Sequence, residues 1–420
     1  MKNNEIIIIG GGPSGVAAAY GASKEGANVL LIEKYGFLGG MATTALVHPW
    51  MTYYAGKKPI IRGFFELVVK ELKKRNGYKD SRHFGIKHHC FDHEALKNIL
   101  LEQLLKNKVQ LLFHTNFCNV IKKGNSIKSV IVESKSGLEE IKGKFFIDAT
   151  GDGDLFAIAG IPSEKGRQKD GFMQPMTLHF RMGGVNVKSM PSREEINRLY
   201  NIAKLKGQIR CPRENLLWFD TVYNDQIHFN TTRIIKADGT KNADLTYAEI
   251  EGRRQMNEII KFLKEKIPGF KNSYLLISAA QVGVRETRRL IGKYVLTEDD
   301  ILNLKKFDDC ICHNSYSIDI HNPKGEGTEI KNLPKGKFHD IPFRSLVPKG
   351  VDNLLVCGRP ISVTHEAHSS IRIQPVCYAT GQAAGVGAYL CVKEKKSPDK
   401  INIKKLQNIL IKQGAFLKLS

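Results

Sequence analysis

The stretch Ile6-Ile7-Ile8-Ile9-Gly10-Gly11-Gly12-Pro13-Ser14-Gly15 decides the fold. Four β-branched residues in a row are typical of a strand buried on both faces of a parallel sheet. Residues 10–15 satisfy G-x-G-x-x-G, and the Ala-rich residues 16–25 favour a helix. Gly26 ends that helix, and residues 28–32 are expected to form a second strand that ends at Glu33. This order of elements predicts an α/β, Rossmann-like domain with a parallel sheet.

Each part of this segment has a physical role in holding a dinucleotide. Gly10 makes the tight turn, Gly12 lets the backbone approach a pyrophosphate, and Gly15 allows close packing of helix on strand. Pro13 and Ser14 begin the helix, whose N-terminus favours phosphate groups. Glu33 stands where a carboxylate accepts hydrogen bonds from ribose hydroxyls, which disfavours a 2′-phosphate. The motif alone leaves FAD and NAD open.

Four later segments narrow the choice of cofactor. They are KYGFLGGMATT at residues 34–44, FFIDATGDG at residues 145–153, NLLVCGR at residues 353–359 and GQAAG at residues 381–385. With VRETRR at residues 284–289 they resemble the FAD superfamily related to glutathione reductase and p-hydroxybenzoate hydroxylase, and within it a bacterial family of FAD-dependent oxidoreductases. The resemblance spans nearly the whole chain and implies FAD as the cofactor.

The resemblance also implies which residues contact FAD. Besides the glycine turn and Glu33 they are Lys34, Gly40, Met41, Ala42, Thr43, Val120, Ala149, Thr150, Gly151, Gly358, Arg359, Gln374 and Gly381. One position departs from the wider superfamily, where the late glycine is usually followed by Asp. Here Arg359 follows Gly358, so a guanidinium–phosphate contact is expected in place of a carboxylate–ribityl contact.

The middle of the chain has no nucleotide signature. Strands are expected at residues 176–185, 218–223 and 226–235, and a helix with a capping box at Thr246 is expected to run to Ile267. An α+β substrate domain on an antiparallel sheet is therefore expected to be inserted into a discontinuous FAD domain. The expected division is FAD domain 1–160 and 345–393, substrate domain 161–344 and helical tail 394–420.

Four side chains are candidates for chemistry beside the flavin, which takes a hydride at N5 and leaves a proton or a developing charge to the protein. His365 and His368 are three residues apart near the presumed flavin loop, Arg372 precedes the late helix, and Arg285 follows an apolar strand.

His48 is expected to line the flavin face. A metal at His88, His89 and His93 is disfavoured against a solvated or capping cluster, because matching Cys or carboxylate spacing is absent, so no metal is expected.

The favoured function is hydride transfer between a small organic substrate and flavin N5. The arginines favour an anionic or polyhydroxylated substrate. No C-x-x-C and no second G-x-G-x-x-G with strand and acid occur, so a separate electron donor or acceptor is expected. An FAD enzyme that modifies tRNA and a non-catalytic flavin-binding module stay open as alternatives.

The composition bears on the partners and the compartment of the protein. The chain has 420 residues, with 64 Lys+Arg against 42 Asp+Glu, a net charge of +22. The lysines are interleaved with acids and no RNA-recognition signature occurs, which disfavours a nucleic-acid partner. Eight scattered cysteines and the absence of a long apolar run favour a cytoplasmic protein with reduced thiols and no membrane partner. Whether the chain is a homo-oligomer stays open.

Overall fold

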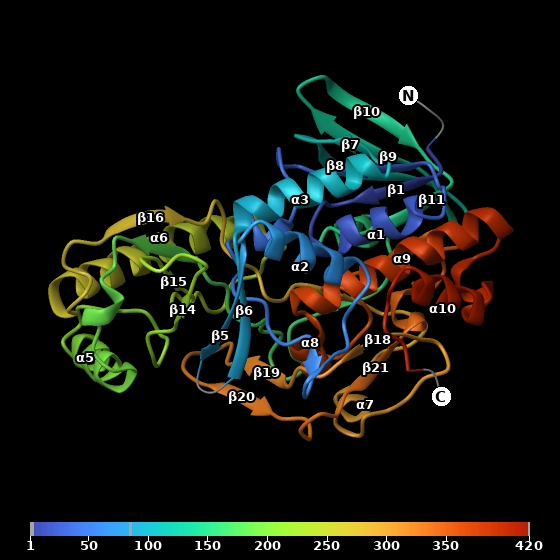
Figure 1. The fold of residues 1–420 in the computed structure, drawn as a ribbon. Helices are drawn as coiled ribbons and strands as arrows, with labels where there is room; N and C mark the ends of the chain where they lie inside the picture. The colour runs from blue at the N-terminus through green and yellow to red at the C-terminus, as the bar shows by residue number, and fades with distance from the viewer. Residues whose placement is uncertain (1–3, 84–85, 419–420) are drawn as a thin grey trace.

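The computed structural model describes residues 4–83 and 86–418, with a parallel sheet at its centre (Figure 1). Its strand order is β22-β11-β1-β2-β7, and every neighbouring pair is parallel. The strands are β1 (Ile6–Ile9), β2 (Val29–Ile32), β7 (Gln110–Leu112), β11 (Phe145–Asp148) and β22 (Leu354–Val356). Because β22 comes from the last fifth of the chain, the sheet is discontinuous in sequence. The predicted Rossmann-type α/β fold is confirmed.

Two helices with small residues pack together beside this sheet. α1 (Pro13–Ser23) lies against α9 (Gln374–Glu394) with their backbones in near contact. A Cβ added at Gly385 would lie 2.0 Å from the carbonyl oxygen of Ala18, and one at Gly381 would lie 2.1 Å from that of Ser14. The glycines of α9 therefore allow this close approach.

A three-stranded antiparallel sheet lies beside the parallel one. It consists of β8 (Asn116–Lys123), β9 (Ser126–Ser134) and β10 (Gly137–Lys142). Before it, Asp92 caps α3 (His93–Lys106) by accepting from the N–H groups of Glu94 and Ala95. Gly124, at φ +59°, makes the tight turn between β8 and β9.

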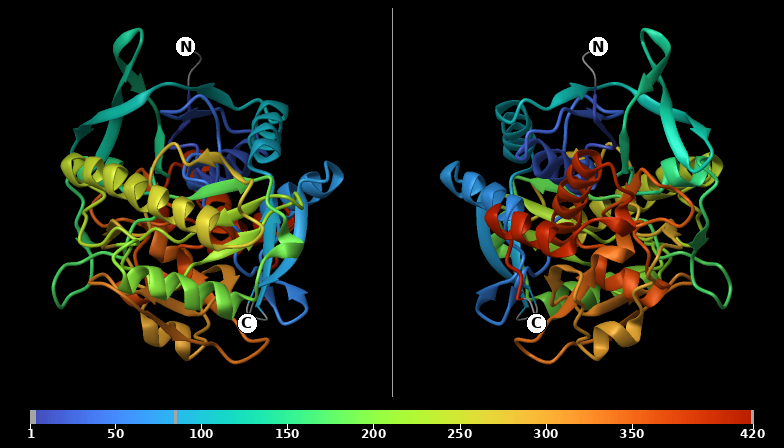
Figure 2. Two further views of the ribbon diagram at one scale, coloured as in Figure 1. Left: turned by 90° about the vertical axis from the view of Figure 1, so that its left-hand side faces the viewer. Right: turned by 90° about the vertical axis from the view of Figure 1, so that its right-hand side faces the viewer.

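The middle of the chain forms a lobe at the left of Figure 1, which faces the viewer in the left panel of Figure 2. An antiparallel sheet in the order β14-β15-β13-β16 carries two helices, α5 and α6. These elements are β13 (Phe180–Gly183), α5 (Arg193–Leu205), β14 (Trp218–Asp220), β15 (Ile227–Phe229), α6 (Asn242–Lys266) and β16 (Tyr274–Ser278).

Two details of the lobe differ from the sequence expectation. The strands are shorter than predicted, since residues 176 and 177 form only isolated bridges. The helix starts four residues before Thr246, so the predicted capping box is wrong. The Thr246 hydroxyl donates to the Asn242 carbonyl within the helix, and Glu249 accepts from the N–H of Val282. A backbone N–H of the loop after β16 thus uses the carboxylate that a helix cap would have needed.

Short elements complete the chain. They are β3 (Tyr54–Ala55), β4 (Lys58–Pro59), α2 (Phe64–Lys74), β5 (Tyr78–His83), β6 (Ile86–Phe91), α4 (Asp154–Ile158), β12 (Ser163–Lys165), β17 (Arg288–Leu290), α7 (Glu298–Leu302), β18 (Cys310–Asn314), β19 (Ile318–His321), β20 (Thr328–Lys331), β21 (His339–Pro342), α8 (His365–Ile371), α10 (Ile403–Lys412) and the 3₁₀ turns η1 (Gly40–Ala42), η2 (Val187–Ser189), η3 (Phe343–Leu346) and η4 (Pro398–Lys400). The predicted closing helix corresponds to α10.

The buried apolar side chains divide between the lobe and the rest of the molecule. Residues 176–284 share one core with Leu46. Leu296 to Ile341, which were expected in the same inserted domain, pack instead into the core that contains α1 and α9. The lobe with its own core is therefore shorter than the segment 161–344.

All eight cysteines are free and seven of them are buried, as expected for structural thiols. Among the helices of the described residues, none has both the length and the apolar character that a bilayer span requires.

Candidate functional site

A cavity of about 580 Å³ lies where the glycine turn, the end of β11, the lobe and the start of α9 meet. Of the residues expected to hold the cofactor, it is lined by Gly10, Gly12, Pro13, Ser14, Glu33, Lys34, Gly40, Met41, Ala149, Thr150, Gly151, Arg359 and Gln374. These residues come from five separate stretches of sequence. The structure therefore brings most of the predicted cofactor residues to one cavity.

The glycine turn presents bare backbone to this cavity. Gly10 has φ +101°, and a Cβ there would lie 2.5 Å from the carbonyl oxygen of Ala149. Gly12 is the N-cap residue of α1, and no side chain caps this helix. The first-turn amides thus remain available at the cavity wall, where they suit a phosphate. A Cβ at Gly12 would have its nearest neighbour 3.7 Å away, so this space is open.

Glu33 lies at the end of β2 and also borders the cavity. One carboxylate oxygen accepts from the N–H of Gly11 at 2.6 Å, and the other accepts from the N–H of Tyr35 at 3.0 Å. Burial raises the pKa of Glu33 although both backbone contacts favour its charged form. A carboxylate retains acceptor capacity beyond these two bonds, so a ribose hydroxyl fits beside it.

The remaining predicted cofactor residues do not line the cavity. Gly15, Gly358 and Gly381 serve close packing: a Cβ at each would lie 1.8 Å from Gly10 O, 2.5 Å from Ser14 Oγ and 2.1 Å from Ser14 O, respectively. Ala42 and Thr43 are buried in and after the 3₁₀ turn η1. Val120 is half-buried on β8 against an apolar cluster. These positions shape the walls around the site.

Arg359 and Gln374 are bound to protein groups at the cavity wall. Arg359 Nε donates to Gly151 O at 2.9 Å, and its other nitrogens contact Val284 O and the Asp152 carboxylate. Gln374 accepts from the Trp50 indole N–H at 2.6 Å. Arg359 thus ties the turn after β11 to the chain that leaves the lobe. The expected contact of its guanidinium with a phosphate stays a prediction.

Both arginines predicted for chemistry border the cavity. Arg285 Nη1 donates at 2.6 Å to Pro175 O and to Thr177 Oγ1, and Nη2 donates to Asn230 Oδ1 at 3.1 Å. Arg372 Nη2 donates to the backbone carbonyl of Asp319 at 3.3 Å, and its buried Nε has no hydrogen-bond partner in the described protein.

The surroundings of Arg285 are positively charged. Burial, followed by the guanidinium groups of Arg372, Arg213 and Arg233, lowers the pKa of Arg285. The carboxylates within this group are Glu214, 3.3 Å from Arg233, and Asp319, 3.8 Å from Arg372. Four guanidinium groups thus face two carboxylates, and an excess of buried positive charge favours an anionic ligand.

His365 and His368 do not border the cavity, although their sequence neighbours do. His365 Nδ1 lies 2.8 Å from Glu286 Oε1, which also pairs with Arg289. His368 is fully buried, and burial and nearby arginines hold its pKa well below the usual range. Their helix α8 places both rings behind the wall. Beside them, Glu286 pairs with Arg289, and Arg288 pairs with Asp154 at 2.9 Å.

Several cavity residues gave no recognisable sequence signal. His179, Arg213, Asn230, Tyr316, Asp319 and His321 line the cavity from separate strands and loops. His48, by contrast, was expected beside the flavin, and it borders the cavity. Of the two expectations for His88, His89 and His93, a solvated or a capping cluster, the solvated one is wrong, because all three side chains are buried.

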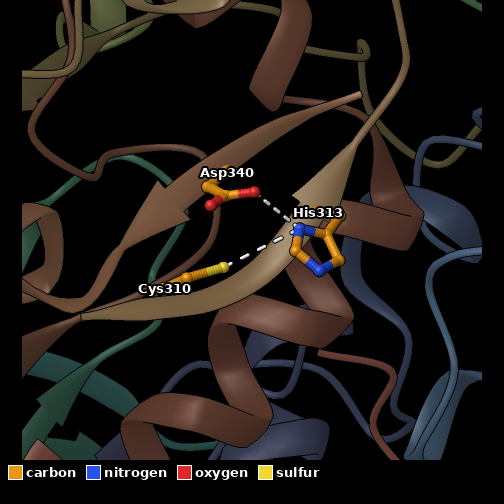
Figure 3. A group of neighbouring side chains, drawn as sticks. All are labelled: Cys310, His313 and Asp340. Atoms are coloured by element: carbon orange, nitrogen blue, oxygen red, sulfur yellow. Dashed lines mark hydrogen bonds and ion pairs between the residues drawn. The ribbon is translucent and has the colours of Figure 1, made fainter. Parts of the chain in front are cut away.

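Within the described residues, one group combines three metal-ligating side chains: Cys310, His313 and Asp340 (Figure 3). His313 Nδ1 lies 2.8 Å from Asp340 Oδ1, and Nε2 accepts from the N–H of Lys418 at 2.8 Å. Both ring nitrogens therefore have protein partners. This group anchors the segment after α10 to β18 and β21.

The parallel sheet, the glycine turn and the acid after β2 define a dinucleotide-binding protein, and the later segments add the features of a flavoprotein. Residues 5–410 match the family described as "FAD dependent oxidoreductase". The chain belongs to this family, and its cofactor is FAD.

Curated relatives match shorter parts of the chain. Ferredoxin–NADP reductase of Streptococcus agalactiae is 31% identical over 105 residues, which cover 25% of this chain and 31% of that protein. Mitochondrial dihydrolipoyl dehydrogenase 1 of Arabidopsis thaliana is 32% identical, over 38% of this chain and 30% of that protein. The chain thus spans about a third of the length of these relatives.

A solved structure is similar over most of its length. p-Nitrophenol 4-monooxygenase PnpA from Pseudomonas putida DLL-E4 has a TM-score of 0.52 at 9% identity, covering 98% of this chain and 85% of that one. At this identity the similarity shows the fold alone.

Proposed function

We propose that the protein is a dehydrogenase or reductase that transfers a hydride between FAD and a small organic anion. FAD, when bound, supplies the two-electron chemistry at N5. The proposal rests on the half-buried guanidinium of Arg285, which borders the same cavity as the glycine turn and lies among other guanidinium groups. A carboxylate or similar anion would compensate the positive charge that Arg213, Arg285 and Arg372 bring to the cavity.

The chain's own residues have distinct tasks in this proposal. The glycine turn and the first turn of α1 hold the diphosphate, and Glu33 holds the ribose. Arg285 and Arg372 orient the substrate anion. Arg285 is itself held by three protein oxygens, on Pro175, Thr177 and Asn230. Such fixed donors lose little conformational freedom when the anion binds.

We propose that residues 161–344 provide the substrate-binding part of the cavity. The lining residues Arg213, Asn230, Arg285 and Asp319 all come from this segment. Residues 1–160 and 345–393 are proposed as the FAD side, and residues 394–420 as a helical tail. The absence of a second nucleotide-binding motif in the sequence supports a separate molecule as electron donor or acceptor.

The test is anaerobic bleaching of the flavin absorbance by matched pairs of metabolites, each carboxylic acid beside its amide. Hydroxy acids, amino acids and their uncharged partners form the panel. We expect at least one acid to bleach the flavin at least about tenfold faster than its amide, because a lost charge-assisted hydrogen bond costs about 1.5–3 kcal/mol. Equal rates within every pair, or no bleaching by any acid, would contradict the proposal.

Arg285→Met tests the anion site itself. We expect KM for the active acid to rise about 10- to 100-fold, since a buried charged contact is lost, while FAD occupancy stays unchanged. Arg198→Met is the matched control, because Arg198 is exposed on α5 and pairs with Glu195. An unchanged KM in Arg285→Met would refute the assignment of Arg285.

A further inference from the structure

Two histidines and a buried arginine form a row from the cavity wall into the sheet of the lobe. His179 directly precedes β13 and borders the cavity. Arg181 lies on β13 opposite His228 of β15 in the antiparallel register. Arg181 is only 2% exposed, and beyond it lies His93 at the start of α3. The contacts between these side chains therefore run in the order His179, His228, Arg181, His93.

The hydrogen bonds along this row have one possible direction. A guanidinium can only donate, so Arg181 Nε donates to His228 Nδ1 at 3.4 Å. A neutral His228 must then carry its proton on Nε2, which lies 3.0 Å from His179 Nδ1. His179 Nδ1 is thereby the acceptor, so its own proton is on Nε2.

This direction holds only if both imidazoles are neutral, and their surroundings keep them so. Burial, then Arg285, Arg181 and Arg213, hold the pKa of His179 well below its usual range. Burial is also the largest cause of the lowered pKa of His228. The charged or titratable groups around His228 are His48, His179, Arg181 and His93, and all of them lower its pKa. No acid opposes these effects among the causes that act on either ring.

The edge of the His179 ring that carries Nε2 lies next to another cavity residue, Gly283. The ring carbon Cδ2, which adjoins Nε2, is 3.4 Å from the position of a Cβ at Gly283. Arg285 Nη1 donates at 2.6 Å to Thr177, two residues before His179. Arg285 Nη2 donates to Asn230, two residues after His228. His179 and Arg285 thus belong to one part of the cavity.

We propose that His179 is an N–H donor to an oxygen of the substrate, and that His228 and Arg181 hold it in the Nε2–H form. The substrate part of this inference rests on the proposed function, whereas the tautomer part does not. A nitrogen that already carries its proton cannot act as a base. His179 instead stabilises a substrate oxygen on which negative charge develops during hydride transfer, and Arg181 and His228 are positioning residues.

The tautomer is tested by NMR on the holoenzyme labelled with ¹⁵N-histidine, with His179→Gln and His228→Gln used to assign the signals. We expect both rings to carry one proton, on Nε2, with no titration from pH 8 to pH 5.5. Arg181→Lys, which keeps a donor-only group, should preserve this pattern, and Arg181→Met should mix the tautomers of His228. An Nδ1–H signal on either wild-type ring, or protonation of either ring in this pH range, would overturn the proposed tautomers of His179 and His228.

The donor role is tested by flavin bleaching with the active acid. His179→Leu should slow bleaching about 100-fold or more, the usual effect of removing one such donor, while His179→Gln, which keeps an N–H group, should stay within about tenfold of wild type. If His179→Leu reacts as fast as wild type, the donor role fails and the proposed function stands. If His179→Gln is as slow as His179→Leu, His179 acts as a base and the donor role again fails.

Discussion

Glu33 connects two backbone segments with one carboxylate. Its oxygens accept from the N–H groups of Gly11 and Tyr35, so this side chain holds the glycine turn against the end of β2. The sequence pattern identified Glu33 from its distance to Gly15, which is a local property of a strand–helix–strand unit. The two backbone contacts were not predictable, because they depend on how the chain turns after Ile32.

Replacing Glu33 with Gln tests this role. An amide offers one oxygen where the carboxylate offers two, so one of the two backbone N–H groups loses its acceptor, at a cost of about 1–3 kcal/mol. We expect a lower Tm and weaker FAD binding, measured by thermal melting and fluorescence titration. Glu71→Gln, at a half-buried position of α2 where the side chain pairs with Lys74, is the control. Unchanged values for Glu33→Gln would show that the carboxylate is not needed.

Several residues on the helices and strands have other roles than their sequence positions suggested. The small residues of α9 were recognised, but Gly381 was assigned to the cofactor, whereas it packs against Ser14. His365 and His368 were chosen for their place next to the flavin loop, and helix α8 turns them toward Glu286 and the interior. His179 and His228 were missed because only the pairing of β13 with β15 brings them together.

Gly385→Ala tests the packing of α1 on α9. The added Cβ would lie 2.0 Å from the carbonyl oxygen of Ala18, so the two helices must move apart. Overpacking of this kind costs about 1–3 kcal/mol, and we expect a lower denaturation midpoint in urea. Lys393→Ala, at the exposed end of α9, should change stability by less than about 0.5 kcal/mol. A Gly385→Ala protein as stable as wild type would contradict the close approach.

The whole molecule contains many buried histidines whose pKa lies below the usual value. Their pKa is lowered mainly by burial, to about 4 for His93 and His339 and well below the usual value for five others. In the described chain these five are His48, His179, His228, His321 and His368. Burial acts oppositely on Asp148, whose pKa it raises to about 6.

These shifts predict that the folded protein loses stability in mild acid. A histidine with a lowered pKa is neutral in the folded state, so below pH about 6.5 the unfolded chain binds more protons. Each such group then costs up to about 1.4 kcal/mol per pH unit as the pH falls toward 4. Glu33, Asp148 and Asp154, whose pKa values burial raises, act in the opposite sense, but the seven histidines outnumber these three acids. We expect Tm to fall steeply from pH 7 to pH 5, and a constant or rising Tm would contradict the buried, neutral histidines.

FAD is proposed to bind in the cavity at the glycine turn. The variant Gly12→Ala tests this placement. Gly12 has φ −73°, and a Cβ there meets nothing closer than 3.7 Å, so alanine fits the protein without strain. The methyl group would occupy the space that the pyrophosphate needs. The measurement is an FAD titration of the wild-type and Gly12→Ala apoproteins. We predict about one FAD per wild-type chain and at least about tenfold weaker binding by Gly12→Ala at an unchanged Tm. Equal affinity of the two proteins, or no FAD binding by the wild type, would contradict the account.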